Sequence, residues 1–150
     1  MKVLLVYHTK TGHTLEAAKA VEEGVRYAGH SIKVVSVQEC DPKHIEEYEI
    51  IIFGTPTWFQ GACAPIKSLL KKMPNDQLRE KMCTAFAVMG GSGGHKAIKE
   101  IDYMVREKGC VDFVHGPVMQ AGGFLSIWKG YPVSKGDLVK LREFGSELVK

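Results

Sequence analysis

The chain has 150 residues, of which 45% are hydrophobic and 25% are charged, and its formal net charge is +3. This composition is typical of a soluble globular protein that buries a full core unaided, so we expect residues 1–150 to form a single domain. No apolar run approaches the length of a membrane span, and no basic cluster is dense enough for nucleic acid, so we expect neither as a partner. Because Met1 and Lys2 lead directly into an apolar stretch, we expect no signal peptide and a cytoplasmic location.

The spacing of cysteines and histidines predicts neither disulfides nor a metal site. The four cysteines are far apart without a C-x-x-C pair, and the six histidines form no H-x-x-x-H or H-E-x-x-H pair. In a cytoplasmic protein we expect free thiols at Cys40, Cys63, Cys83 and Cys110.

The first informative stretch is a strand that ends in a threonine-rich turn. Residues 3–7 are apolar or aromatic and predict a buried strand, and from Leu15 onward apolar residues recur at helical spacing. The helix N-terminus would offer unpaired N–H groups and a partial positive charge, and Gly12 would let the backbone approach a phosphate. Helix capping would explain one threonine here, but not three in six residues. The predicted anion-binding residues are Thr9, Lys10, Thr11, Gly12, His13 and Thr14.

Downstream, apolar strands alternate with amphipathic helices. In chain order, the patterns predict an edge strand at 31–37, a short helical turn at 41–47, a strand at 49–53, a helix starting at 62–65, a strand at 82–89, a helix at 96–108, a strand at 111–118 and a helix from about residue 136. This alternation predicts an α/β fold: a doubly wound five-stranded parallel sheet with helices on both faces. The strand order 2-1-3-4-5 fits, and it places ligands at the carboxyl ends of the strands.

Two further loops follow the third and fourth predicted strands. The loop at 54–61 carries a tryptophan and a phenylalanine, which are costly on a surface unless they cover something flat, although both could simply pack on a helix. Its candidate ligand-binding residues are Thr55, Pro56, Thr57, Trp58, Phe59 and Gly61. The loop at 90–94 has four glycines in five positions, so its backbone could lie against a ring, although a mobile linker is the plainer interpretation. Its candidates are Gly90, Gly91, Ser92 and Gly93.

The first two loops together resemble those of the flavodoxin family. Thr9-x-Thr11-Gly12-x-Thr14 matches the [ST]-x-T-G-x-T loop that holds the FMN phosphate in flavodoxins, and residues 54–61 resemble their G-[ST]-P-T-[aromatic]-x-G loop beside the isoalloxazine. The resemblance covers nearly the whole chain and implies a short-chain flavodoxin-like fold with FMN as the cofactor. The third loop departs from the family because it has no aromatic residue, and the usual heavy negative charge is missing.

The resemblance implies an FMN-binding electron-transfer flavoprotein that cycles through the flavin semiquinone and serves redox partner proteins. In that role Gly61, or the Gln60–Gly61 peptide, is a candidate for a peptide that flips to hold flavin N5–H, although a glycine in a plain helix-start turn is an equal alternative. The alternative function is an NAD(P)H-dependent FMN or quinone reductase of the same fold, in which the open third loop admits a second ring and His95 contacts the acceptor.

A third interpretation, a signalling domain without flavin, needs an acidic cluster after the first strand, where this chain has Thr9-Lys10-Thr11. The positive charge lies after residue 54, with Lys67, Lys71 and Lys72 just beyond the second loop in sequence. These lysines favour an acidic redox partner if they are not simply a solvated face.

Overall fold

The computed structural model, which describes residues 1–58, 61–121 and 132–150, confirms a doubly wound parallel sheet. Five parallel strands run in the order β2-β1-β3-β5-β6, and a sixth, very short strand (β4) pairs antiparallel with the end of β3. The order of the five long strands is the predicted one. The elements are β1 (Lys2–Tyr7), α1 (His13–Tyr27), β2 (Ser31–Ser36), a 3₁₀ turn η1 (Val37–Glu39), β3 (Ile50–Trp58), β4 (Gly61–Ala62), α2 (Ala64–Lys72), β5 (Met82–Met89), α3 (Gly94–Glu107), β6 (Asp112–Gln120) and α4 (Lys135–Leu148).

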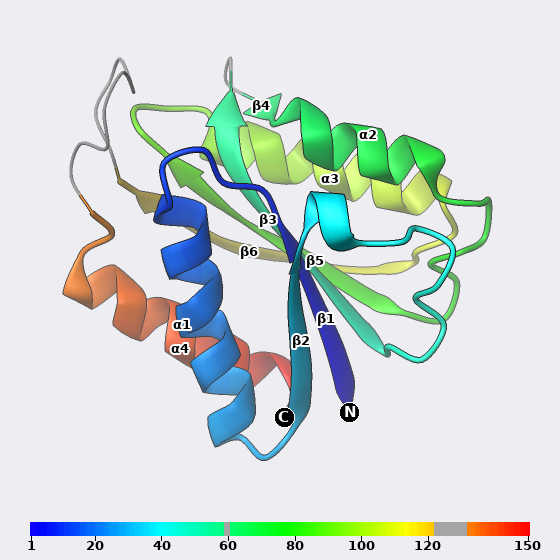
Figure 1. The fold of residues 1–150 in the computed structure, drawn as a ribbon, viewed down its shortest axis with the longest axis horizontal. Coiled ribbons are helices and arrows are strands. Elements are labelled where there is room, and N and C mark those ends of the chain that lie inside the picture. Colours follow the sequence, from blue (N-terminus) through cyan, green and yellow to red (C-terminus); the bar gives the residue numbers. More distant parts are fainter. Residues whose placement is uncertain (59–60, 122–131) are drawn as a thin grey trace.

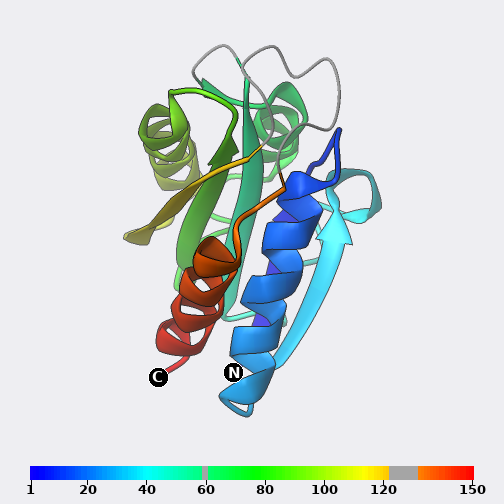
Figure 2. The ribbon, with the colours of Figure 1, turned by 90° about the vertical axis from the view of Figure 1, so that its left-hand side faces the viewer.

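The helices cover both faces of the sheet in two pairs. Figures 1 and 2 show α1 and α4 side by side on one face, with α2 and α3 on the other. Successive strand residues point to opposite faces, so the apolar strands supply both cores. Leu4, Ile51 and Phe53 pack under α2 and α3, while Leu5 and Ile52 pack under α1 and α4. The continuous apolar strands seen in the sequence are therefore explained by burial on both sides.

The third strand is longer than the sequence predicted. Residues 54–58, which we expected to begin a loop, continue β3 and pair with β5 from Ile50↔Met82 to Pro56↔Val88. The strand then turns back, and Trp58 pairs with Gly61. The predicted second loop is therefore largely a β-hairpin that rises from the edge of the sheet (Figure 1).

The helical turn predicted at 41–47 is wrong. This segment forms consecutive turns, in which His44 N donates to Asp41 O and Tyr48 N donates to Ile45 O. The Asp41 carboxylate accepts a bond from Lys43 N at 2.9 Å. Short polar side chains that bond their own backbone two residues on favour turns over helix, which explains the difference.

The cysteines all carry free thiols, and three of them, Cys63, Cys83 and Cys110, are buried in the core beneath α2 and α3. Within residues 1–58, 61–121 and 132–150, no helix is long and apolar enough to cross a membrane. The same residues contain no group of three or more side chains that could hold a metal ion.

Candidate functional site

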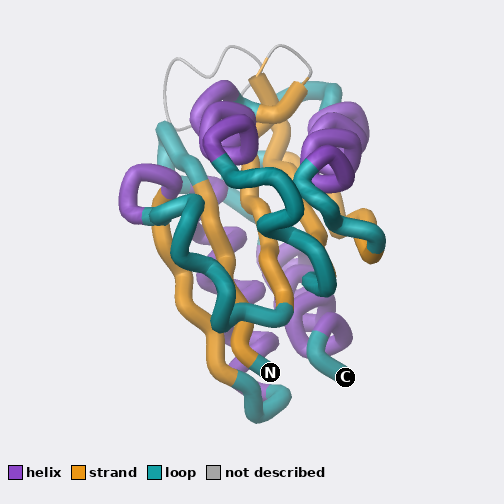
Figure 3. The backbone as a smooth tube through the Cα atoms, turned by 90° about the vertical axis from the view of Figure 1, so that its right-hand side faces the viewer, coloured by secondary structure: helices purple, strands orange, loops and turns teal. Residues whose placement is uncertain are grey.

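Three strands end at one edge of the sheet and deliver the three predicted loops there. Because β1, β3 and β5 are parallel neighbours, their carboxyl ends at Tyr7, Trp58 and Met89 lie at the same side of the molecule (Figures 1 and 3). A backbone bond ties the first two loops together, since His8 N donates to Gly54 O at 3.2 Å. The described residues of the three loops at this edge are called the rim.

The first loop leads into a helix N-terminus that is open to an anion. Gly12 precedes α1 with a φ of 94°, a left-handed conformation that glycine adopts without strain. Its N–H donates to Thr9 Oγ1 at 2.9 Å, which closes the turn. No side chain in the described part of the chain caps this helix, so the N–H groups of its first turn face the loop. Thr11 is half-buried beside them and Thr14 is buried in the first turn.

His8 stands between β1 and the threonines, and it was missed among the predicted site residues. Partial burial lowers its pKa below the ordinary 6.5, because an imidazolium loses solvation there. The ring is therefore held in its neutral form at neutral pH. Its position directly after a buried strand was the sequence signal that could have identified it.

Glu16 is a second residue that sequence analysis missed. Its carboxylate in the first turns of α1 accepts a bond from Val133 N at 3.0 Å. This contact spans 117 positions and brings the chain that leads into α4 back beside the first loop. Nothing in the local pattern around Glu16 indicates it, because the partner is a backbone group far along the chain.

The two threonines of the hairpin differ in their hydrogen bonds, because Thr55 bonds the hairpin's own backbone and Thr57 has no partner among the described residues. Thr55 is fully buried, and its hydroxyl donates to Pro56 O at 2.7 Å and accepts from Cys63 N at 3.0 Å. The buried hydroxyl oxygen of Thr57 has no hydrogen-bond partner among the described residues, a property it shares with Thr84 inside β5. A buried hydroxyl is rarely left unbonded. At the rim, Thr57 therefore fits a polar ligand.

The third loop resembles the first in how it enters its helix. Gly93 precedes α3 with a φ of 94°, and no side chain within the described residues caps that helix. Gly91 and Ser92 are exposed, while Gly90 and Gly93 are half-buried. Two helix N-termini thus open toward one edge, each entered through a left-handed glycine, and backbone N–H groups are the main polar groups that they offer.

The structure brings most of the predicted residues to this rim, with two exceptions to the expected roles. The Thr55 side chain points into the protein, and Gly61 is buried in β4. The predictions for Phe59 and Gln60 lie outside the described residues, and only the backbone of Trp58 is described. Ring stacking by Trp58 stays a prediction.

The geometry defines a class of α/β proteins. Their ligand site lies at the carboxyl ends of β1 and β3, where the strand order of the five-stranded parallel sheet reverses. The model of the family "Flavodoxin" matches residues 5–123, so the chain belongs to the flavodoxin family, whose members bind FMN. A flavodoxin from Clostridium saccharobutylicum is 34% identical over 95 residues, 63% of this chain and 59% of that protein.

Two further likenesses bear on fold and function. A solved flavodoxin structure from the domain Archaea has a TM-score of 0.78 at 20% identity, covering 99% of this chain and 96% of that one, and it supports the fold. An NAD(P)H dehydrogenase (quinone) from Archaeoglobus fulgidus is 27% identical over 46% of this chain and 49% of that protein. The matched parts therefore span only about half to three fifths of these two curated relatives.

Proposed function

We propose that this protein binds FMN at the rim and serves as an electron carrier between redox partner proteins. The observation that carries the proposal is the uncapped N-terminus of α1, entered through Gly12 and surrounded by Thr9, Thr11 and Thr14. FMN supplies the redox chemistry when it is bound, and the protein supplies the binding and the electrostatics.

The phosphate of FMN belongs at the first loop. The first-turn N–H groups of α1 donate to it, and the helix dipole favours its charge. Thr9 already accepts the bond from Gly12 N, so its hydroxyl proton remains available for donation. A phosphate monoester fits this cradle, which supports FMN over riboflavin.

The flavin ring belongs between the hairpin and the third loop. Thr57 supplies an unbonded hydroxyl on the hairpin side. On the other side, Gly90 to Gly93 supply backbone groups with little side-chain obstruction. The three loops hold the ring at the edge of the sheet, where a partner protein reaches it.

The electrostatics of the rim favour a partner with acidic character. The loop sequences at 8–14, 54–61 and 89–95 contain no aspartate or glutamate, while Lys10 and Lys96 are exposed there. The lysines singled out from the sequence serve this purpose less well. Lys71 and Lys72 occupy the last turn of α2, far from the hairpin, and Lys67 is paired with Glu100.

The second candidate function is an NAD(P)H-dependent quinone reductase. It is supported by the similarity to the Archaeoglobus protein and by the third loop, residues 90–94, which contains no aromatic residue. It would need a nicotinamide ring to stack on the flavin in place of a partner protein.

One experiment separates the two functions. The FMN-loaded protein is mixed anaerobically with NADH or NADPH and is then reduced stepwise with dithionite. A carrier shows no rapid bleaching by either nucleotide, and a blue one-electron-reduced flavin appears midway through the titration. Rapid two-electron bleaching without that species would assign the protein to the reductases. Absence of FMN binding would reject both functions.

A further inference from the structure

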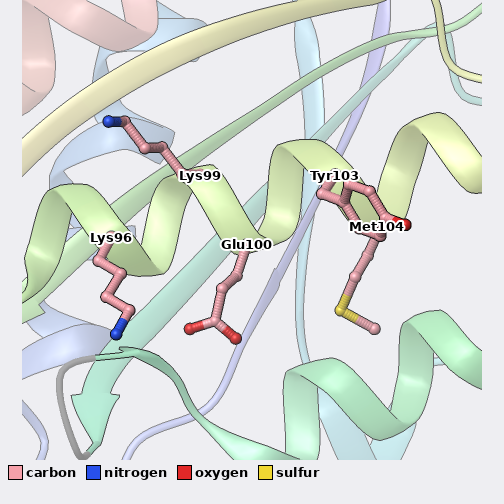
Figure 4. A pocket seen from close by; sticks show the side chains of 5 residues that line it. All are labelled: Lys96, Lys99, Glu100, Tyr103 and Met104. Carbon is pink, nitrogen blue, oxygen red and sulfur yellow. The ribbon is translucent and has the colours of Figure 1, made fainter.

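Glu100 reaches from the middle of α3 to the base of the hairpin. Its carboxylate accepts a bond from Ala62 N at 3.2 Å, and its second oxygen lies 3.5 Å from Lys67 Nζ on α2. Figure 4 shows Glu100 pointing toward the hairpin and α2, whereas Lys99 on the same helix points away. One side chain thus joins α3, β4 and α2.

The same carboxylate occupies the place where a side chain at residue 61 would begin. A Cβ atom at Gly61 would overlap Oε1 of Glu100. Gly61 does not have a positive φ, so its backbone is open to other residues. A side chain at residue 61 would therefore displace the flexible end of Glu100, and this contact favours glycine for a reason different from the peptide flip that the sequence suggested.

Glu100 also lies in the helix that carries the third loop. α3 begins at Gly94, directly after the glycine run, and Glu100 lies less than two turns further along. The side chain is about one third exposed and borders a shallow hollow lined by Lys96, Tyr103 and Met104. Gly61 and Ala62 pair with Trp58 and Thr57 inside the hairpin, whereas Thr55 bonds Cys63 and β5 pairs no further than Pro56 along β3. The bond to Glu100 is what ties the Gly61–Ala62 peptide to α3.

We propose that Glu100 is a positioning residue that holds the Gly61–Ala62 end of the hairpin against α3, and that it thereby fixes the spacing between the second and third loops. The idea rests on the proposed function in so far as those loops enclose a flavin ring. Glu100 itself touches no ligand.

The first test uses the flavin-free protein and needs no cofactor. Amide hydrogen exchange is measured by NMR at Ala62 and, as an internal reference, at Cys63, whose N–H bonds Thr55. Glu100→Ala removes a charged acceptor, so exchange at Ala62 should rise by roughly tenfold or more while Cys63 is unchanged. Glu100→Gln keeps an acceptor oxygen and should restore most of the protection. Asp102→Asn, on the same helix, is the matched control and should leave Ala62 unaffected.

Gly61→Ala provides an independent variant. Its new methyl group should displace the Glu100 carboxylate and raise Ala62 exchange as Glu100→Ala does, without adding to it in the double variant. If Ala62 exchange is unchanged in both Gly61→Ala and Glu100→Ala, the proposal is overturned. Should Glu100→Ala fail to fold, unchanged exchange in Gly61→Ala alone overturns it.

The second test links the contact to the site. FMN and riboflavin affinities of Glu100→Ala should fall by the same factor, roughly fivefold, because the ring side is loosened and the phosphate cradle is intact. Faster amide exchange at Ala62 in Glu100→Ala together with unchanged flavin affinity would overturn the positioning role. A wild-type protein that protects Ala62 through Glu100 but binds no flavin would reject the proposed function and leave the contact established.

Discussion

Hydroxyl groups at the rim have different partners, and this difference assigns their roles. Thr55 is consumed by the hairpin, Thr9 closes the turn before α1, and Thr57 has no partner among the described residues. Thr9, Thr11 and Thr14, which stand beside the N-terminus of α1, are therefore the threonines that we propose bind the phosphate, and Thr57 is the one that we propose contacts the ring. The sequence pattern treats all these threonines alike, whereas their hydrogen bonds separate them.

The first prediction concerns the phosphate cradle. Thr11→Ala should weaken FMN binding by roughly 1–3 kcal/mol, the range for a hydrogen bond to a charged group, and should leave riboflavin affinity nearly unchanged. Isothermal titration of the flavin-free protein measures both. Thr84→Val, which removes a hydroxyl unbonded among the described residues, is the control and should not affect either ligand. Equal weakening of both flavins by Thr11→Ala would contradict the phosphate assignment.

The second prediction concerns His8 and pH. Since burial lowers its pKa in the folded state, the unfolded chain takes up this proton more readily below the ordinary value of 6.5. The contribution of His8 to stability is therefore complete above about pH 6.5 and is lost as the pH falls through the folded pKa.

Urea denaturation of the flavin-free protein between about pH 7.5 and pH 5.5 measures this effect. His8→Asn should flatten the pH dependence in that window. The exposed carboxylates whose pKa values are lowered by hydrogen bonds, such as Asp41, titrate at lower pH and do not interfere. If the unfolding free energy of His8→Asn depends on pH as strongly as that of the wild type, another group causes the loss of stability at low pH.

At the scale of elements, α1 and α4 approach so closely that glycines are needed between them. A Cβ at Gly24 would overlap the carbonyl oxygen of Arg142, and one at Gly145 would overlap that of Val21. The contact between these helices closes one face of the sheet (Figure 2). It also positions the N-terminus of α1 at the rim.

The third prediction tests this helix contact. Gly24→Ala gains about 1 kcal/mol of helix propensity but should destabilise the protein by roughly 1–3 kcal/mol overall, because the methyl group forces the helices apart. Gly136→Ala in α4 is the matched control, since nothing lies within 4 Å of its Cβ position. It should stabilise the fold by up to about 1 kcal/mol. Equal unfolding free energies for the two variants would contradict the close approach.

At the scale of the whole molecule, the three loop sequences at the rim contain no carboxylate and exposed Lys10 and Lys96 lie in or next to them, although the net charge is only +3. Such a local field steers encounters with acidic partners more than the total charge suggests. Lys96 lies near the hairpin (Figure 4), whereas Lys72 lies at the far end of α2. Substitutions of Lys96 and Lys72 can therefore be compared, since the first lysine lies near the rim and the second is remote from it.

The fourth prediction uses small acceptors as probes of this field. Oxidation of the reduced flavoprotein by ferricyanide should slow several-fold as the Debye length shortens from about 30 to about 8 Å, and oxidation by a cationic cobalt complex should accelerate. Lys96→Gln should reduce the salt dependence, and Lys72→Gln should change it little. Stopped-flow kinetics measure the rates. Salt dependence of the same sign for both acceptors would exclude a positive rim.

The sequence by itself determined the architecture and the position of the threonine-rich turn before α1. Apolar strands alternating with amphipathic helices can bury both strand faces only in a parallel sheet covered on both sides, which explains why the strand order was predicted. The turn and the uncapped start of α1, where we propose that the phosphate binds, were also predictable, because a strand end, Gly12 and the threonines are neighbours in the chain.

Only the tertiary structure decided what depends on contacts between distant residues. Pairing with β5 and the bond from Cys63 to Thr55 turned the expected second loop into a hairpin. A side chain at Gly61 would meet that of Glu100, 39 positions away, and one at Gly24 would meet the backbone of α4. Periodicity and propensity describe each segment alone, whereas these contacts form between segments that are far apart in the chain. The local sequence pattern therefore could not predict them.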